Sequence, residues 1–307
     1  MPNSIETLIK ETKSRARYFQ AVHAWPLNEK LDYDGWLSNF KSDEEIKIAC
    51  SILDFFIYYP DNMVDQMLKS SIDHAGYYLS NTLSDWKHED FVNRCFYSFI
   101  PGENQNPSDS GRLFLRKLRD VLGIPENRLI EYAQIPEVLD KIGKPTPIIL
   151  VDDFVGSGAQ CDKAWNRNKF NHNDKTLKQI SETEGHVFVY SPLIVNYQGY
   201  ERIKNNCKDL ILTQSHILGK EYNLFNKECF CWKNDDTFFH EGTSFIIQKS
   251  AELGIPDRNG NHPQDVRGFG QQGLAIAFEH GAPDAIPSFF YWCHKDWIPL
   301  IQKTYHR

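Results

Sequence analysis

Two adjacent carboxylates stand near the middle of this sequence, in a setting that suggests binding chemistry. Asp152 and Asp153 follow the apolar run 148–151 and precede a loop that contains Gly156-Ser157-Gly158. Two like charges at the end of a buried strand are unfavourable unless the hydroxyls of a diol or a divalent metal neutralise them. Small residues let backbone amides approach an anion at the start of the next helix, where phosphate is favoured. Together these features predict a site for a 5′-phosphorylated ribose.

The neighbouring sequence explains how such a site would be positioned. Residues 148–151 are apolar at every position, which is typical of a central strand covered on both faces. In an open parallel sheet, ligands bind beyond the carboxyl ends of the strands. We therefore expect both acids at that end of the sheet, with a helix opening directly after the loop and running to about residue 170.

The first third of the chain has a helical pattern. Ser42 and Glu45 have the spacing of a capping box. Apolar residues at helical spacing follow from Ile46 to Ile57, and a further helix is expected from Asp61. We predict a helical unit over residues 1–90 and an α/β domain over residues 91–307.

In the second part, short apolar stretches alternate with helical segments. This alternation predicts an α/β fold with a mostly parallel sheet, helices covering both faces. The expected strands lie near residues 91–100, 148–151, 186–195, 210–212, 273–278 and 289–292. The polar segments 166–184 and 255–272 are predicted to be long surface loops.

The stretch from Ile148 to Gln160 resembles the signature of the phosphoribosyltransferase family. The resemblance implies a phosphoribosyltransferase-type sheet, with Asp152 and Asp153 on the ribose hydroxyls and as catalytic residues. It also implies 5-phosphoribosyl-1-pyrophosphate with Mg²⁺, the metal being held mainly by ligand oxygens. The loop residues that would bind the 5′-phosphate are Val155, Gly156, Ser157, Gly158, Ala159 and Gln160.

Two departures from that family pattern bear on function. Purine-salvage members carry an aspartate three residues after the second acid, where this chain has Gly156, and this argues against purine salvage. A pyrophosphate loop is also not evident. The candidates are Pro101 and Gly102 after a predicted strand, and Ser108, Ser110 and Arg112 at a predicted helix start.

The whole chain is also similar to phosphoribosyltransferase-like proteins of bacterial conflict systems. The similarity lies in the N-terminal helical region, the central VDDF-G-SG motif and a C-terminal block over residues 268–292. It implies an effector of anti-phage defence that acts on nucleotides or nucleic acids. Within the block, His280 beside Glu279 is a candidate general base or ligand contact, or else a structural histidine in a proline-rich turn.

Composition limits the remaining functions. The formal net charge of −7 disfavours a broad nucleic-acid footprint, so contact with nucleic acid would be local or indirect. The 7 cysteines are irregularly spaced and predict buried, reduced thiols in a cytoplasmic protein rather than a zinc site. No leader-like segment or apolar run of membrane length is present, so no membrane partner is expected.

Several alternatives remain open. The acids could simply cap the following helix, or the loop could belong to a methyltransferase or another nucleotide-binding α/β domain. A hydrolase elbow and a P-loop are disfavoured, because the required glycine and lysine are missing. The leading hypothesis is an enzyme that makes or breaks an N-glycosidic bond. The others are a ribonucleotide sensor that signals to a protein partner in a defence system, and a scaffold with a vestigial site.

Overall fold

The computed structural model describes residues 4–27, 29–102 and 110–303. The chain divides into two compact units: residues 1–63 together with 219–307, and residues 64–218. The first unit therefore combines the beginning of the chain with its end. The boundary predicted near residue 90 falls inside the second unit, and a division there remains a prediction.

The first unit packs helices around a core of large aromatic side chains. Trp36, Phe40 and Phe290 are all buried, and the rings of Phe40 and Phe290 lie 5.0 and 6.2 Å from that of Trp36. The predicted capping box is confirmed, because the Glu45 amide donates to Ser42 Oγ at 3.2 Å. The elements of this unit are α1 (Ile5–Ala21), α2 (Tyr33–Ser38), α3 (Asp43–Phe55), β1 (Ile57–Tyr59), α11 (Asp236–Glu252) and β7 (Ile276–Phe278).

The structure corrects the expected end of the helix that begins after Ser42. Helix α3 ends at Phe55, and the next residues form strand β1 instead of a last helical turn. Ile57 pairs with Ile276 and Tyr59 with Phe278 in a parallel two-stranded sheet. The partner strand lies more than two hundred residues away in sequence, so helical periodicity could not reveal this pairing.

The second unit is built on a parallel sheet, and the predicted α/β fold class is confirmed. Its strand order is β2-β3-β4-β5, with β6 also paired to β4. The strands are β2 (Phe96–Phe99), β3 (Pro147–Val155), β4 (Val187–Asn196), β5 (Ile211–Leu212) and β6 (His216–Leu218). The helices are α4 (Asp61–Thr82), α5 (Asp90–Asn93), α6 (Ser110–Leu122), α7 (Ile135–Ile142), α8 (Ala159–Asn166), α9 (Leu177–Glu184) and α10 (Tyr197–Asn206).

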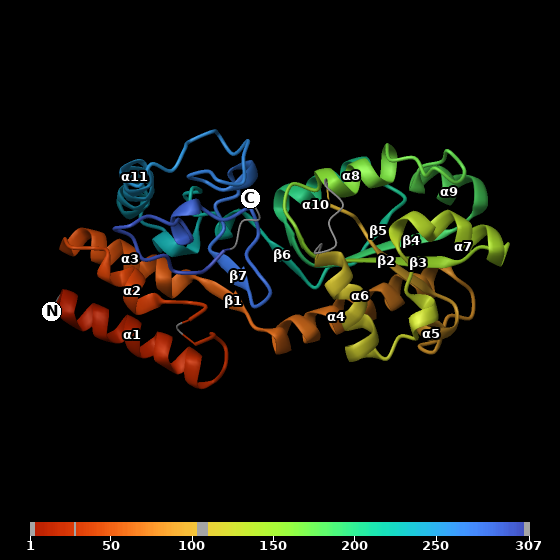
Figure 1. The fold of residues 1–307 in the computed structure, drawn as a ribbon, viewed down its shortest axis with the longest axis horizontal. Coiled ribbons are helices and arrows are strands. Elements are labelled where there is room, and N and C mark those ends of the chain that lie inside the picture. The colour runs from red at the N-terminus through yellow and green to blue at the C-terminus, as the bar shows by residue number, and fades with distance from the viewer. Residues whose placement is uncertain (1–3, 28, 103–109, 304–307) are drawn as a thin grey trace. The chain divides into compact units, whose positions relative to one another are not determined.

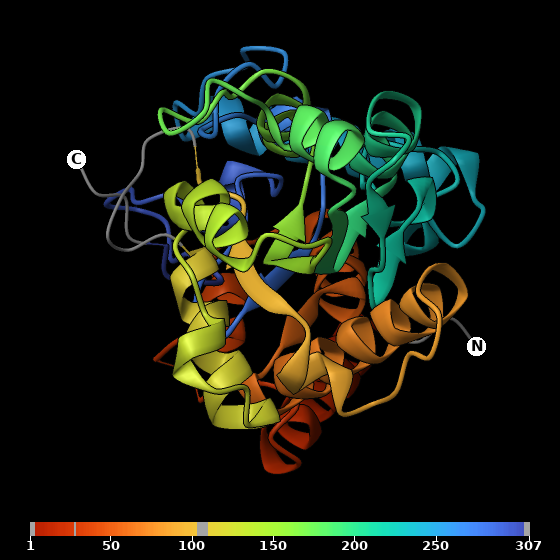
Figure 2. The same cartoon turned by 90° about the vertical axis from the view of Figure 1, so that its right-hand side faces the viewer.

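Helices cover both faces of this sheet (Figure 1). Helices α7 to α10 share one apolar core with alternate residues of the central strands, such as Ile148, Leu150 and Tyr190. Helices α4 and α6 lie on the other face, and α6 contacts β2 and β3. Figure 2, which turns the unit by 90°, likewise shows green α9 above the sheet and orange α4 below it. The sheet is thus buried on both sides, as its apolar strands require.

Three other local predictions are wrong. Residues 177–184, expected to be loop, form α9, because Thr176 and Gln179 make a capping box and Leu177 and Ile180 are buried. The expected strand near residue 91 is helix α5, and strand structure begins only at Phe96. The stretch 289–292 contains a 3₁₀ turn over Ser288–Phe290. No helix in the part of the chain that the structure describes is long and apolar enough to cross a membrane.

Candidate functional site

The central strand continues through both acids. Strand β3 was expected over residues 148–151, but it extends to Val155, because Asp152 pairs with Pro192 and Val155 with Val195 of β4. On its other side β2 pairs only as far as Val151. The acids therefore lie beyond the last residue of β2, at the carboxyl edge of the sheet, where ligands of parallel sheets bind.

The two acids have different surroundings, since successive side chains of a strand point to opposite faces. Asp152 is 9% exposed and lies on the face that carries α8, where the Tyr190 hydroxyl donates to its Oδ2 at 2.7 Å. Asp153 is half-buried on the face of α6, where Ser110 Oγ donates to its Oδ1 at 3.1 Å. Asp153 is thus the more accessible carboxylate, and Asp152 is held from within. Sequence reasoning missed Tyr190, which no local motif marks.

Burial determines the protonation of Asp152. Burial raises the pKa of the Asp152 carboxyl well above the ordinary value of 3.8. The negative charge of Asp153 is the second cause and acts in the same direction. The hydrogen bond from Tyr190 opposes this shift. Burial also raises the pKa of the Tyr190 hydroxyl, which therefore remains a donor. A buried acid beside a second acid is a feature more typical of functional sites than of stable cores.

The loop after the acids rests directly on the first turn of α10. A Cβ atom at Gly199 would lie 2.6 Å from the Gly156 carbonyl oxygen and 2.8 Å from Val155 Cγ1. A Cβ at Gly158, which has a φ of +70°, would lie 2.9 Å from the Gly199 oxygen. The path of this loop thus depends on glycine at both sites. Sequence reasoning missed Gly199, although a glycine inside a helix often marks such an approach.

The loop leads into α8 with its amides at the helix start. Gly158 is the N-cap and Ala159 the first helical residue. The amides of the first turn have no intrahelical acceptor, and the helix dipole favours an anion there. Ser157 Oγ accepts from the Ala159 amide at 3.4 Å, and the side chain of Gln160 is exposed. This arrangement of backbone donors suits a phosphate group.

The comparisons with known proteins agree with this geometry. The PRTase-CE family model, which describes a phosphoribosyltransferase-like family, matches residues 33–303. The chain belongs to the PRTase-CE family. No match was found among the curated proteins. The match of this PRTase-CE chain includes both acids, the loop and the C-terminal block, so the resemblance to phosphoribosyltransferases is confirmed at the level of the family.

The predicted pyrophosphate-loop residues of this PRTase-CE protein do not share one location. Pro101 and Gly102 follow β2, whose last residue Phe99 pairs with Val151, so they leave the sheet next to the acids. Ser110 reaches Asp153, as described above. Arg112 instead points to Glu131, with Nη2 3.2 Å from its carboxylate and both side chains about half exposed. The remaining candidate, Ser108, lies outside the described residues.

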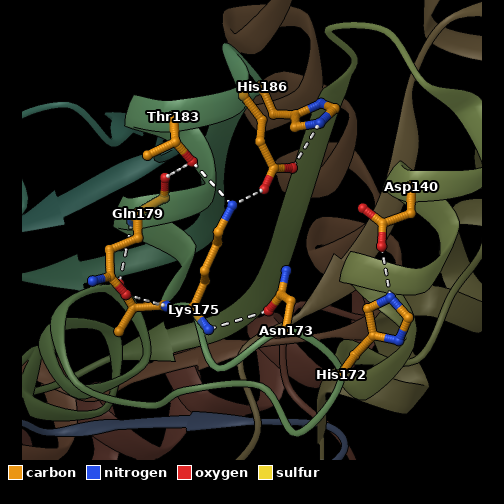
Figure 3. Close-up of polar contacts among 9 residues, drawn as sticks. Asp140, His172, Asn173, Lys175, Gln179, Thr183 and His186 are labelled. Atoms are coloured by element: carbon orange, nitrogen blue, oxygen red, sulfur yellow. Dashed lines mark hydrogen bonds and ion pairs between the residues drawn. The ribbon is translucent and has the colours of Figure 1, made fainter.

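A cavity of about 430 Å³ opens beside Pro101. Tyr132 and the segment 167–172 line most of its remaining wall. Two of its lining side chains contact carboxylates. Lys169 Nζ is 2.7 Å from Asp174. His172 Nε2 is 2.6 Å from Asp140 (Figure 3). The cavity thus lies next to the segment that follows the carboxyl end of β2 in this PRTase-CE protein.

A polar network tethers the segment that lines this cavity (Figure 3). Lys175 Nζ lies 2.8 Å from one oxygen of Glu184, and His186 Nε2 lies 3.5 Å from the other. His186 is buried, and its Nδ1 accepts from the Thr146 amide at 3.0 Å. The network joins the loop before α9 to the start of β4, and it includes side chains that sequence reasoning did not single out.

Acid should weaken this network. Burial lowers the pKa of the His186 imidazole below its ordinary value of 6.5. The unfolded chain then binds a proton that the folded chain does not, so stability is lost as the pH falls below about 6.5. We expect His186→Asn, which keeps an acceptor for the Thr146 amide, to flatten the fall in unfolding free energy between pH 6.5 and 5. Urea denaturation across that range measures it, and an unchanged slope would contradict the assignment.

The other predicted catalytic residue, His280, belongs to the first unit. It follows β7 in a tight turn in which the Phe278 amide donates to the Gly281 carbonyl at 2.7 Å. Its ring lies 5.0 Å from that of Phe278. Glu279 beside it pairs with Lys30 at 3.1 Å. The acids belong to the second unit, so the catalytic role of His280 remains a prediction.

Proposed function

We propose that this protein binds a 5-phosphoribosyl group, as a donor or a nucleotide, and makes or breaks its N-glycosidic bond. The observation that carries the proposal is the half-buried Asp153, followed directly by a glycine loop that is seated on Gly199 and opens α8. Membership of a phosphoribosyltransferase-like family supports it. The role as an effector of bacterial anti-phage defence, with a protein partner in the cytoplasm, rests on the similarity of the whole chain to conflict-system proteins.

Each part of the site has a separate task in this proposal. Asp153 accepts a hydrogen bond from a ribose hydroxyl, and the amides of residues 156–160 hold the 5′-phosphate. Asp152, buried against Tyr190, fixes the end of β3 and so positions Asp153. The carboxylate of Asp153 favours the positive charge that develops on the ribose ring as the glycosidic bond stretches.

A magnesium ion fits this site only as part of the ligand. Asp153 offers a partly accessible carboxylate, whereas the described residues contain no group of three or more acidic, histidine or cysteine side chains that could hold a metal. Mg²⁺ usually keeps most of its bonds to water and phosphate oxygens and takes one or two carboxylates. When bound, it would neutralise a departing pyrophosphate, while the protein positions the ribose.

A non-catalytic sensor is the second candidate. Gly156 stands where purine-salvage enzymes have an aspartate, and Arg112 pairs with Glu131. The first observation removes a group that would act on a base, and the second shows a candidate pyrophosphate contact paired with an acid. A sensor would bind ribonucleotide without turnover and pass the signal to a partner protein. Chromatography can follow the conversion of nucleotide to free base and ribose 5-phosphate. The enzyme should form these products, and the sensor should not.

Thermal stability tests the binding proposal directly. We expect 5-phosphoribosyl-1-pyrophosphate with Mg²⁺ to raise the unfolding free energy by about 2.7 kcal/mol at a hundred times its dissociation constant. For a chain of this size that is roughly 4 °C in melting temperature. Asp153→Asn should lose the rise, because it removes the accessible carboxylate.

The matched control is Asp209→Asn, which removes the same charge from an exposed position of the same unit. It should keep the full ligand-induced rise. If the Asp153→Asn protein were stabilised as much as the control, or if the folded wild-type protein gave no rise at saturating ligand, the proposed site would be wrong.

A further inference from the structure

A second cavity of the 64–218 unit lies away from the acids and their loop. Its volume is about 320 Å³, within the range of small-molecule sites. It is formed by the second half of α4, by α10 and the turn after it, and by the edge strand β5. Its lining residues are His74, Tyr78, Tyr200, Ile203, Lys204, Cys207, Lys208, Leu210, Ile211, Leu212 and Gln214. None of residues 152–160 contributes to it.

The charge of this cavity is opposite to that of the protein. The chain has a net charge of −7, yet the lining contains two lysines and a histidine and no carboxylate. Lys204 contacts Tyr200, with Nζ 5.3 Å from the ring centre and 3.5 Å from the hydroxyl. Within the described ranges neither Lys204 nor Lys208 forms an ion pair with an acid. Two unneutralised ammonium groups at the mouth of one cavity favour an anion.

Aromatic and aliphatic side chains form much of the remaining lining of the cavity. The rings of His74 and Tyr78 lie 5.4 Å apart on α4, and Tyr200 faces from α10. Ile203 and Leu210 form a buried base. Aromatic rings over an apolar floor suit a planar ring system, because every nucleobase presents such a face for stacking.

One polar atom distinguishes a base from a simple anion. Gln214 lines the cavity, and its Oε1 is buried without a hydrogen-bond partner among the described residues. A buried acceptor left unpaired is unfavourable, and a ligand that donates an N–H to it removes that cost. Exocyclic amines and ring N–H groups of nucleobases are such donors. Ribose hydroxyls can donate as well, so the preference for a base over a sugar phosphate comes from the aromatic side chains.

From these observations we propose that the cavity is a binding site for a free nucleoside monophosphate, separate from the phosphoribosyl site. Lys204 and Lys208 bind the phosphate, while Tyr78 and Tyr200 stack on the base. Gln214 accepts from an N–H of the base. The site does not depend on the proposed chemistry at Asp153, because the two share no residue.

The test is calorimetric titration of the full chain with AMP in the absence of Mg²⁺. AMP also carries a phosphoribosyl group, so the titration is repeated in Asp153→Asn, which removes the first site. In that background we expect saturable binding at the cavity, and adding Lys204→Gln/Lys208→Gln should weaken it by about tenfold or more, because charge-assisted hydrogen bonds are lost. Tyr78→Leu should also weaken it. The matched control Lys144→Gln/Lys178→Gln removes two lysines of the same unit outside the cavity and should bind like the wild type.

Asp153→Asn should keep AMP binding at the cavity while it loses any AMP binding at the phosphoribosyl site, which separates the two sites. In that variant, ribose 5-phosphate and inorganic phosphate should not compete at equal concentration, because they lack a base. Absence of AMP binding would overturn the proposal. So would binding that is lost in Asp153→Asn and retained in the Lys204→Gln/Lys208→Gln protein, or equal competition by inorganic phosphate.

Discussion

Gly199→Ala is expected to destabilise the protein and to abolish binding of a phosphoribosyl ligand. A single methyl group at this position would lie 2.6 Å from the Gly156 carbonyl oxygen and 2.8 Å from Val155 Cγ1. Neither atom is at the end of a flexible chain, so the loop or α10 must move. Overpacking of this kind typically costs about 1–3 kcal/mol. A shift of the loop by a fraction of an ångström would also move its amides away from the proposed position of the phosphate.

Helix propensity alone would predict the opposite change in stability for Gly199→Ala. Gly199 lies inside α10, where alanine would by itself stabilise an isolated helix by about 1 kcal/mol. Propensity and packing therefore predict opposite signs. Urea denaturation measures the change in unfolding free energy, and titration with ribose 5-phosphate measures the loss of binding. Asn205→Ala, at an exposed position of the same helix, should be neutral or slightly stabilising. A Gly199→Ala protein with raised stability and normal binding would show that the close approach is not required.

Asp152→Asn is expected to have the opposite effect on stability. The raised pKa of Asp152 means that the folded chain holds a proton more tightly than the unfolded chain. The unfolding free energy of the wild type therefore falls as the pH rises from about 3.8 towards the raised pKa. Asparagine does not titrate, so the unfolding free energy of the variant does not fall for this reason. We expect the variant to be more stable than the wild type at pH 7, and the difference should become smaller towards pH 4.

Denaturation at several pH values measures this effect, and Tyr190→Phe provides the control. Removing the hydroxyl that donates to Asp152 Oδ2 should destabilise the wild type more than it destabilises Asp152→Asn, because the charged carboxylate needs that donor more. The Asp152→Asn protein should also bind phosphoribosyl ligands more weakly, since its stability comes at the expense of the site. A variant that is less stable than the wild type at every pH would contradict the raised pKa.

The pair of effects has a common structural reason. Asp152 and Gly199 both hold the end of β3 in one arrangement, one through a buried carboxylate and the other through the absence of a side chain. Asp152 is not the choice that maximises stability, as the expected gain from Asp152→Asn indicates, whereas Gly199 is required by packing despite its low helix propensity. A buried acid that lowers stability at a strand end is more typical of a functional site than of a stable core.

Short-range patterns determined much of this protein from the sequence. The capping box at Ser42 and Glu45, the apolar strand before Asp152 and the helix start after Gly158 all depend on neighbours within a few residues. Such features follow from hydrogen bonding and burial within one element, so the sequence alone predicted the α/β class and the position of the candidate site. The capping box at Thr176, which begins helix α9, is also a short-range pattern, although it lies within a polar stretch that favours a loop.

Only the tertiary structure decided which distant groups meet. The sequence placed Asp152 and Asp153 together, but the fold buried the first against Tyr190 and left the second beside Ser110. It also brought Gly199 under the loop and paired β1 with β7 across most of the chain. These contacts depend on strand order and on how helices pack across the sheet, which involve residues far apart in sequence. No local periodicity contains that information, because the same pattern of apolar and polar residues is compatible with several arrangements of strands.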